Sequence, residues 1–145
     1  MEVLIFPDAQ SLARKSADLV ESQIKAFPDS VIGLATGSTP LGLYKELIDR
    51  HTNYGLSFKQ VKTFNLDEYV GVPGDHPQSY STFMDENLFN EIDIEKSNTE
   101  VPDGMADNPL EVGPAYEKMI ENAGGIDLQI LGVGTDGHIG FNEPT

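Results

Sequence analysis

The chain has no cysteine and few basic residues. Without cysteine, its 145 residues can form neither disulfide bonds nor metal sites built on thiolates. Nine Lys and Arg stand against 24 Asp and Glu, which gives a formal net charge of −15. No basic stripe is available to neutralise phosphates, so nucleic acids are excluded as partners and anionic membrane surfaces are disfavoured.

Long hydrophobic runs are also missing. No apolar run approaches the roughly 20 residues that a membrane-spanning helix needs. The opening stretch MEVLIFPDAQ has an acid at its second position and only a short apolar patch, which is unlike a signal peptide. We therefore expect a cytoplasmic protein without membrane partners.

Size and composition fit one globular domain. Hydrophobic residues make up 39% of the chain and charged residues 23%, which are ordinary values. A chain of 145 residues can bury a core of its own, and no repeat, linker or low-complexity tract divides it. We expect a single domain over residues 1–145, and a homo-oligomer is compatible with the sequence.

Apolar periodicity predicts alternating strands and helices. Strands are expected at 2–6, 31–35, 61–66 and 126–134, and helices at 9–27, 40–51, 79–92 and 115–123. Loops are expected at 71–77 and 94–110. Strands that are apolar on both faces are typical of a parallel sheet. The expected fold is a layered, Rossmann-like α/β fold with helices on both faces and an open crevice at the C-terminal ends of the strands.

Three polar stretches each begin where a predicted strand ends. They are Thr36–Thr39, Asn65–Tyr69 and Gly132–Glu143. The carboxyl ends of parallel strands share one edge of the sheet, and ligands of open α/β folds bind in the crevice there. We therefore expect the three stretches to meet at one site.

The first stretch, ATGSTP, can bind a phosphate. A short turn between a strand and a helix leaves backbone N–H groups free, and the hydroxyls of Ser38 and Thr39 add further donors. The spacing is not that of a P-loop. The alternative is an ordinary helix start, with Thr39 as the cap and Pro40 following.

The second stretch, NLDEYVG, offers a carboxylate for acid–base chemistry. Asp67 and Glu68 are neighbours at a strand end, so their side chains are expected to point to opposite faces. Only one of them can then enter the site, where burial would raise its pKa and make it a general base. The alternative is a solvated turn.

The third stretch, GVGTDGHIGFNEPT, fits G-x-G-x-x-G with glycines at 132, 134 and 137. A dinucleotide-binding turn also needs a following helix and an acid about twenty residues later, and HIGFNE is a poor helix start. Asp136, His138 and Glu143 instead supply an imidazole between two carboxylates, which suits proton transfer near neutral pH.

Two alternatives remain for this third stretch. The same groups could hold a metal ion, although no second histidine is near, since His51 and His76 lie in polar segments expected at the surface. The other alternative is a glycine loop with a solvated histidine and no chemical role.

Together the stretches resemble one enzyme family. GLATGSTPLGLYKEL, TFNLDEYVGVPGDHPQSY and GVGTDGHIGFNEP closely resemble the glucosamine-6-phosphate deaminases, and the similarity runs from about Val3 to Thr145. The resemblance implies conversion of glucosamine 6-phosphate and water to fructose 6-phosphate and ammonia, with no metal and no organic cofactor. It also implies a small sugar phosphate as the ligand.

The resemblance further implies the roles of individual residues. Asp67 corresponds to the base that moves a proton from C2 to C1, and His138 to the group that opens the sugar ring. Asp136 and Glu143 correspond to carboxylates that orient and charge the imidazole. The substrate-binding residues implied by the resemblance are Thr36, Gly37, Ser38, Thr39 and Gly137.

Two other functions compete with the deaminase. The 6-phosphogluconolactonases have a similar turn and a similar glycine loop, but their middle motif usually continues as D-E-R and their last loop as H-x-A-S-L-F-P, where this chain has DEYVG and HIGFNEP. A phosphosugar- or nucleotide-binding module without catalysis is the third hypothesis. Deaminases are also longer than this chain, so we expect an N-terminal portion that is weakly active or inactive alone.

Overall fold

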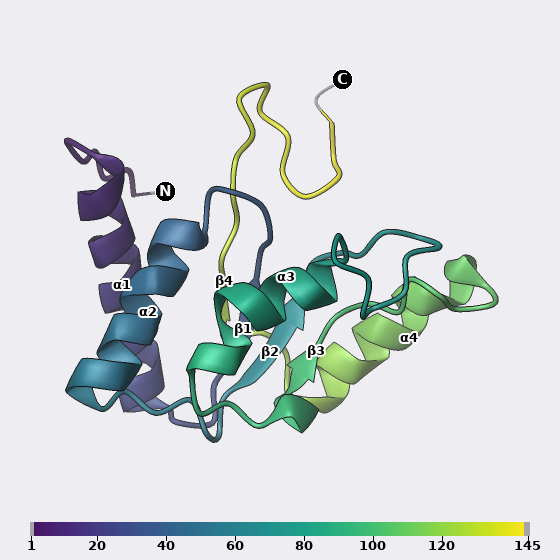
Figure 1. The fold of residues 1–145 in the computed structure, drawn as a ribbon, viewed down its shortest axis with the longest axis horizontal. Helices are drawn as coiled ribbons and strands as arrows, with labels where there is room; N and C mark the ends of the chain where they lie inside the picture. The colour runs from purple at the N-terminus through teal and green to yellow at the C-terminus, as the bar shows by residue number, and fades with distance from the viewer. Residues whose placement is uncertain (1, 144–145) are drawn as a thin grey trace.

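Four parallel strands form the central sheet. The computed structural model describes residues 2–143; Met1, Pro144 and Thr145 of the expected domain lie outside the described residues. The strands are β1 (Val31–Leu34), β2 (Lys62–Asn65), β3 (Thr99–Glu100) and β4 (Leu128–Gln129), in the spatial order β3-β2-β1-β4. Ile32 of β1 pairs with Thr63 of β2 and with Leu128 of β4, so the two long strands are central (Figure 1).

Helices cover both faces of this sheet. They are α1 (Ala9–Ala26), α2 (Leu41–Tyr54), α3 (Tyr80–Asn87) and α4 (Pro109–Asn122). Ile32 and Leu34 of β1 belong to one core cluster with residues of α1, α2 and α3. On the opposite face, the ring of Phe64 packs edge-on against Tyr116 of α4, with 5.6 Å between ring centroids. The expected layered, Rossmann-like α/β architecture is confirmed.

The core explains why these segments fold as they do. Residues at helical spacing on α1 turn one apolar face towards α2, and Asp8 begins α1 by accepting a hydrogen bond of 2.7 Å from the Ser11 amide. The fully buried side chains include Tyr44, Ile32, Leu47, Met84 and Leu88. Between residues 2 and 143, no helix combines the length and apolar character needed to cross a membrane.

The strand predicted at 2–6 is wrong for the part of the chain that the structure describes. Residues 2–6 belong to no strand or helix, and Val3, Leu4 and Ile5 are 68%, 52% and 91% exposed. Their β-rich composition favours a strand, but a strand forms only where a second one pairs with it. Sequence composition alone could not supply that partner.

The other differences concern element ends and short elements inside a predicted loop. The helix predicted at 79–92 stops at Asn87 and continues as a short 3₁₀ helix, Phe89–Glu91. The predicted loop 94–110 contains a second 3₁₀ helix, Lys96–Asn98, as well as β3 and the start of α4. Helix α4 begins before the predicted 115 because Asn108 caps it. The strand predicted at 126–134 forms only at Leu128–Gln129.

Candidate active site

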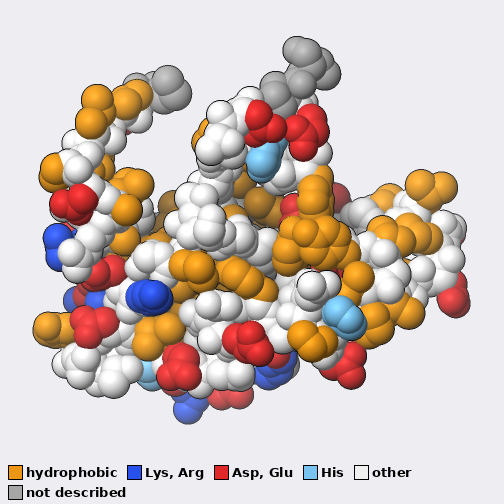
Figure 2. Space-filling view, turned by 45° about the horizontal axis from the view of Figure 1, so that its top comes forward, with side chains coloured by type: hydrophobic (Ala, Val, Ile, Leu, Met, Phe, Trp, Pro, Cys, Tyr) orange, Lys and Arg blue, Asp and Glu red, His pale blue; other side chains and the backbone are white. Residues whose placement is uncertain are grey.

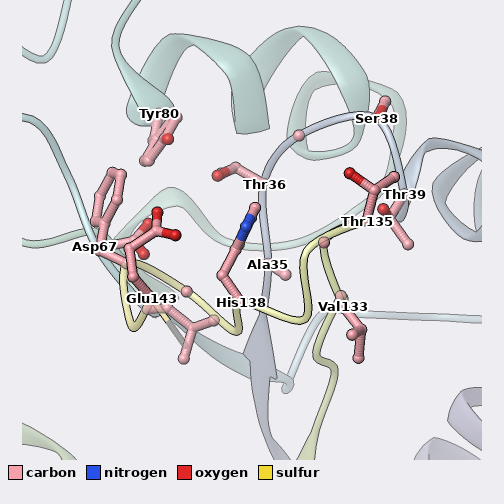
Figure 3. A pocket seen from close by; sticks show the side chains of 16 residues that line it. Ala35, Thr36, Ser38, Thr39, Asp67, Tyr80, Val133, Thr135, His138 and Glu143 are labelled. Atoms are coloured by element: carbon pink, nitrogen blue, oxygen red, sulfur yellow. The ribbon is translucent and has the colours of Figure 1, made fainter. Parts of the chain in front are cut away.

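A cavity of about 500 Å³ lies where β1, β2 and β4 end. All three polar stretches line it: Thr36–Thr39 after β1, Asp67 after β2, and residues between Gly132 and Glu143 after β4 (Figure 3). The sequence-based expectation that these stretches meet at one edge of the sheet is confirmed. Parallel topology brings them together, because each chain segment leaves its strand on the same side.

The turn after β1 forms one wall. Gly37 has a φ of 88°, a left-handed conformation that favours glycine, and it lets the chain reverse between β1 and α2. Helix α2 begins one residue later than predicted: Pro40 is its N-cap residue and makes no side-chain cap. Thr39 therefore does not cap the helix. The first amides of α2 stay available as donors at the positive end of the helix dipole.

Asp67 faces the cavity from the end of β2. Burial, followed by the negative charge of the neighbouring Glu68, raises the pKa of the Asp67 carboxyl above its usual range. Glu68 turns away, and its carboxylate accepts hydrogen bonds from the backbone amides of Tyr80 and Ser81. The two neighbouring acids thus point in different directions, as their positions at a strand end predict, and the pKa of the one in the cavity is raised.

His138 and Asp136 form a close pair in the glycine loop. The imidazole Nδ1 lies 2.6 Å from Asp136 Oδ1. Because Asp136 contacts Nδ1, the other ring nitrogen, Nε2, is the one that can exchange a proton with a ligand. Hydrogen bonds from the His138 backbone and then from its ring lower the pKa of Asp136. The ring also lies against Gly134, where an added Cβ would come within 2.2 Å of it. In Figure 3 the ring points towards Thr36, on the cavity side.

Glu143 completes an acidic group around the imidazole. One ligand atom each from Asp136, His138 and Glu143 lies within 4.8 Å of the others, close enough to share a cation. Oxygen and imidazole ligands of this kind suit several divalent metals. Two carboxylates beside one imidazole also serve proton transfer, so geometry alone allows both interpretations.

Two predicted residues are not among those that line the cavity. Asp136 is exposed and pairs with His138, which does line the cavity. Gly137 does not line it either; it has a φ of 93°, and its amide donates to the Gly134 carbonyl at 3.0 Å in the turn that presents His138. Of the other histidines, His76 is exposed, whereas His51 is half-buried, with Nδ1 2.7 Å from the Leu56 carbonyl oxygen.

Sequence analysis missed Tyr80 as part of the site. Its side chain lines the cavity from the first turn of α3, and its hydroxyl donates to the Tyr69 hydroxyl at 3.0 Å. Burial first, and then the contact with Tyr69, raises the pKa of Tyr80. Tyr69, Tyr80 and Phe141 form an aromatic cluster, with Tyr80 and Phe141 stacked at 6.2 Å. Strand-end reasoning could not find a residue at a helix start.

The cavity has no cation of its own. None of its lining residues is Lys or Arg. In Figure 2, acidic side chains gather beside a histidine at the top of the molecule, whereas the Lys and Arg in view lie lower down. Within the described chain, an anionic ligand would therefore depend on backbone amides and hydroxyls around Ser38 and Thr39.

Comparison with known sequences identifies relatives along the whole chain. The chain is 57% identical to a glucosamine-6-phosphate deaminase of Cellvibrio japonicus and 52% identical to one of Shewanella woodyi, in each case over all 145 residues. It spans 55% of the length of both relatives. The match thus covers all of this chain but only about half of each relative.

Solved structures extend the comparison. A monomeric glucosamine-6-phosphate deaminase superposes with a TM-score of 0.96 at 42% identity, over 99% of this chain and 60% of that one. A 6-phosphogluconolactonase from Thermotoga maritima gives 0.74 at 27% identity, over 97% and 62%. The sequence profile described as "Glucosamine-6-phosphate isomerases/6-phosphogluconolactonase" matches residues 7–140. With that profile covering most of its length, the chain belongs to this family of sugar-phosphate isomerases and lactonases.

Proposed function

We propose that the protein containing this chain converts glucosamine 6-phosphate and water to fructose 6-phosphate and ammonia. One observation carries the proposal: Asp67, His138 and the Thr36–Thr39 turn line a single cavity. A base, a proton carrier and an anion-binding turn are the parts that this reaction needs. The deaminase relatives and the DEYVG and HIGFNEP motifs favour this activity within the family.

In the proposed first step, His138 opens the sugar ring. Opening a pyranose moves a proton from the O1 hydroxyl to the ring oxygen O5, while the bond between C1 and O5 breaks and C1 becomes an aldehyde. An imidazole can accept the proton from O1 and deliver a proton to O5 at nearly neutral pH. Asp136 orients the ring through Nδ1 and stabilises its charged form, which leaves Nε2 for the substrate.

In the second step, Asp67 transfers a proton between carbons. The C1 aldehyde acidifies the C2 hydrogen, so a carboxylate with a raised pKa can remove it and then deliver it to C1. The aldehyde oxygen takes up a proton from the C2 ammonium group, so that protonation of C1 leaves a hydroxymethyl group at C1 and a C=N double bond, an iminium, at C2. Water adds at C2, the C–N bond breaks, and ammonia leaves as the ketone of fructose 6-phosphate forms. Acid–base assistance of this kind is worth about 10²–10⁴ in rate.

The phosphate is proposed to sit at the start of α2. Backbone amides there, the Ser38 and Thr39 hydroxyls, and the turn at Thr36 and Gly37 provide donors. Gly137 contributes by shaping the loop beside them. Because the lining residues include no Lys or Arg, we expect basic groups from outside these residues to complete the phosphate site.

The experiment is ammonia release from glucosamine 6-phosphate by the polypeptide of the complete reading frame. We expect Asp67→Asn to abolish release and also the exchange of the C2 proton with deuterated solvent. Asp29→Asn is the matched control, since Asp29 is exposed and outside the cavity. Exchange at the unmutated rate in Asp67→Asn would remove Asp67 from its role.

A lactonase is the second candidate, because the family and its solved structures include 6-phosphogluconolactonases. In that reaction an imidazole would activate water to attack the lactone carbonyl, and His138 could do this. Hydrolysis of 6-phosphogluconolactone without ammonia release from glucosamine 6-phosphate would favour this candidate. Ligand-induced stabilisation without turnover would instead indicate a binding module, and a response to NAD would indicate a nucleotide.

We also propose that residues 1–145 are the N-terminal part of one longer deaminase domain. In support, β4 is an edge strand of the sheet, and Leu131 and Val133, which follow it, are 48% and 64% exposed. Helix α4 likewise has no fully buried residue. We expect the isolated chain to be weakly active or inactive; robust turnover by it would contradict this. A phosphorylated sugar is a metabolite of the cell interior, so we place the reaction in the cytoplasm. Because the proposed steps are proton transfers, we also expect no metal or organic cofactor.

A further inference from the structure

Glu68 makes three hydrogen bonds to backbone amides. Its Oε1 accepts from the amides of Tyr69 and Tyr80 at 2.8 and 3.0 Å, and its Oε2 accepts from the Ser81 amide at 3.0 Å. Two of these donors belong to the first turn of α3, where the amides have no partner within the helix. A carboxylate also suits the positive end of the helix dipole. One side chain thus joins the end of β2 to the start of α3.

This connection determines where two cavity residues lie. Asp67 directly precedes Glu68, and Tyr80 is the first residue of α3, so both are held relative to the same carboxylate. In Figure 3 the side chains of Asp67 and Tyr80 lie on the same side of the cavity. Ser79 supports the arrangement by capping α3 and donating to the Gly74 carbonyl at 2.7 Å.

The surroundings of Glu68 are acidic and closely packed. Glu68 borders a second, smaller cavity of about 260 Å³, whose lining includes the acids Asp67, Asp103 and Glu117 but no Lys or Arg. A Cβ on Gly104 would lie 3.2 Å from Glu68 Cγ and 2.3 Å from the Tyr69 carbonyl oxygen. With no cation in this lining, the three amides are what stabilise the Glu68 carboxylate in this position.

We infer that Glu68 is a positioning residue for the reaction: by bonding the first turn of α3 to the end of β2, it holds Asp67 and Tyr80 on the same wall of the cavity. The inference rests on the proposed function and adds a residue to it. A catalytic carboxylate misplaced by about 1 Å can lose 10²-fold in rate, so a group that only holds the base has a measurable effect.

Its charge has a second effect, on Asp67. Asp67 shares two cavities with other ionisable groups. Tyr80, His138 and Glu143 line the larger cavity with it, and Glu68, Asp103, Tyr116 and Glu117 line the smaller one. Burial and then the Glu68 charge raise the pKa of Asp67. Removing the charge at 68 should therefore lower the pKa of Asp67 and move the acidic limb of the kcat/KM profile to lower pH.

The experiment compares Glu68→Gln, Glu68→Asp and Glu86→Gln in the complete polypeptide. Glu86 is an exposed residue of α3, the helix that Glu68 contacts, and it borders neither of the two cavities that Asp67 lines. We expect both changes at 68 to lower kcat at least tenfold with KM changed less than about threefold. Only Glu68→Gln should shift the acidic limb, because Glu68→Asp keeps the charge and loses the reach. Glu86→Gln should resemble the unmutated protein in kcat and in the position of the acidic limb.

A hydrogen-exchange measurement separates this inference from the proposed function. The amides of Tyr80 and Ser81 should exchange faster in both variants at 68 than in Glu86→Gln. If the unmutated protein releases ammonia and Glu68→Gln matches Glu86→Gln in kcat, the inference is overturned while the proposed function stands. If the unmutated protein releases none, the proposed function fails, and equal exchange at 80 and 81 in all variants would independently overturn the role of Glu68.

Discussion

The imidazole of His138 lies directly against Gly134, with no room for a side chain between them. An added Cβ at 134 would come 2.2 Å from the ring carbon Cε1. The His138 side chain is 42% exposed, and its Nδ1 is held by Asp136 at 2.6 Å. We therefore expect Gly134→Ala to push the ring from its place and to lower kcat about 10–100-fold.

Stability should barely change in the same variant, because Gly134 is not part of the core. Gly113→Ala is a suitable control: a Cβ there meets nothing within 4 Å. Steady-state kinetics and thermal unfolding of both variants provide the comparison. Unchanged kcat in Gly134→Ala would show that the ring position seen here is not the one used in turnover.

Asp67→Asn is expected to stabilise the protein while it removes activity. The pKa of Asp67 in the folded state is raised above its ordinary value of 3.8, so the folded state binds this proton more tightly than the unfolded chain does. The ionised carboxylate therefore costs stability above the raised pKa, and the cost disappears as pH falls towards 3.8. We expect Tm to rise by about 1–3 °C at pH 7.

The gain should shrink as pH falls through the raised pKa of Asp67. Thermal unfolding of Asp67→Asn and of the exposed control Asp29→Asn, followed from pH 7 to pH 4, tests this dependence. A Tm below that of the unmutated protein at pH 7 would mean that the Asp67 charge is stabilising instead.

Tyr44→Phe should destabilise the protein through a buried hydrogen bond. Tyr44 is fully buried in α2, and its hydroxyl donates to the carbonyl of Ala35, the residue before the Thr36–Thr39 turn. Without the hydroxyl, that carbonyl loses a partner, which costs about 1–2 kcal/mol of unfolding free energy. Tyr54, 75% exposed on the same helix, gives the control Tyr54→Phe. Denaturant unfolding should separate the two variants, and equal midpoints would contradict the role of this bond.

Turnover should not depend on a metal ion. Asp136, His138 and Glu143 could together hold a cation, but the proposed chemistry uses them for proton transfer. We expect ammonia release to persist after dialysis against EDTA, and added Zn²⁺ to inhibit by occupying the imidazole. Activity lost on dialysis and restored by one divalent metal would support the metal-site alternative.

Much of the fold follows from local patterns in the sequence. Apolar patterns place α1, β1, α2 and β2 to within a few residues, because each helix buries one apolar face and each strand is buried almost throughout. The failures occur where pairing is non-local. Residues 2–6 have the composition of a strand without forming one, and the two-residue strand β3 exists only because Thr63 and Phe64 of β2 pair with it.

The topology of the sheet made most of the site predictable, but the prediction missed Tyr80. Strand ends of a parallel sheet meet, so Thr36, Asp67 and His138 could be placed together without coordinates. Tyr80 reaches the cavity from a helix start, where the amides of Tyr80 and Ser81 donate hydrogen bonds to the Glu68 carboxylate. Such a connection leaves no periodic or compositional signal.

None of the residues from Gly132 to Glu143 is fully buried. Apart from glycines such as Gly134, which the His138 ring contacts, substitutions there are less constrained by packing than those in α1 or β1, so this loop can diverge in chemistry while the scaffold beneath it keeps folding. A common ancestor could thus have acquired new reactions by altering one exposed segment. Laboratory evolution of activity on other phosphorylated sugars would best begin with randomisation of the loop positions other than Gly134, Asp136, His138 and Glu143.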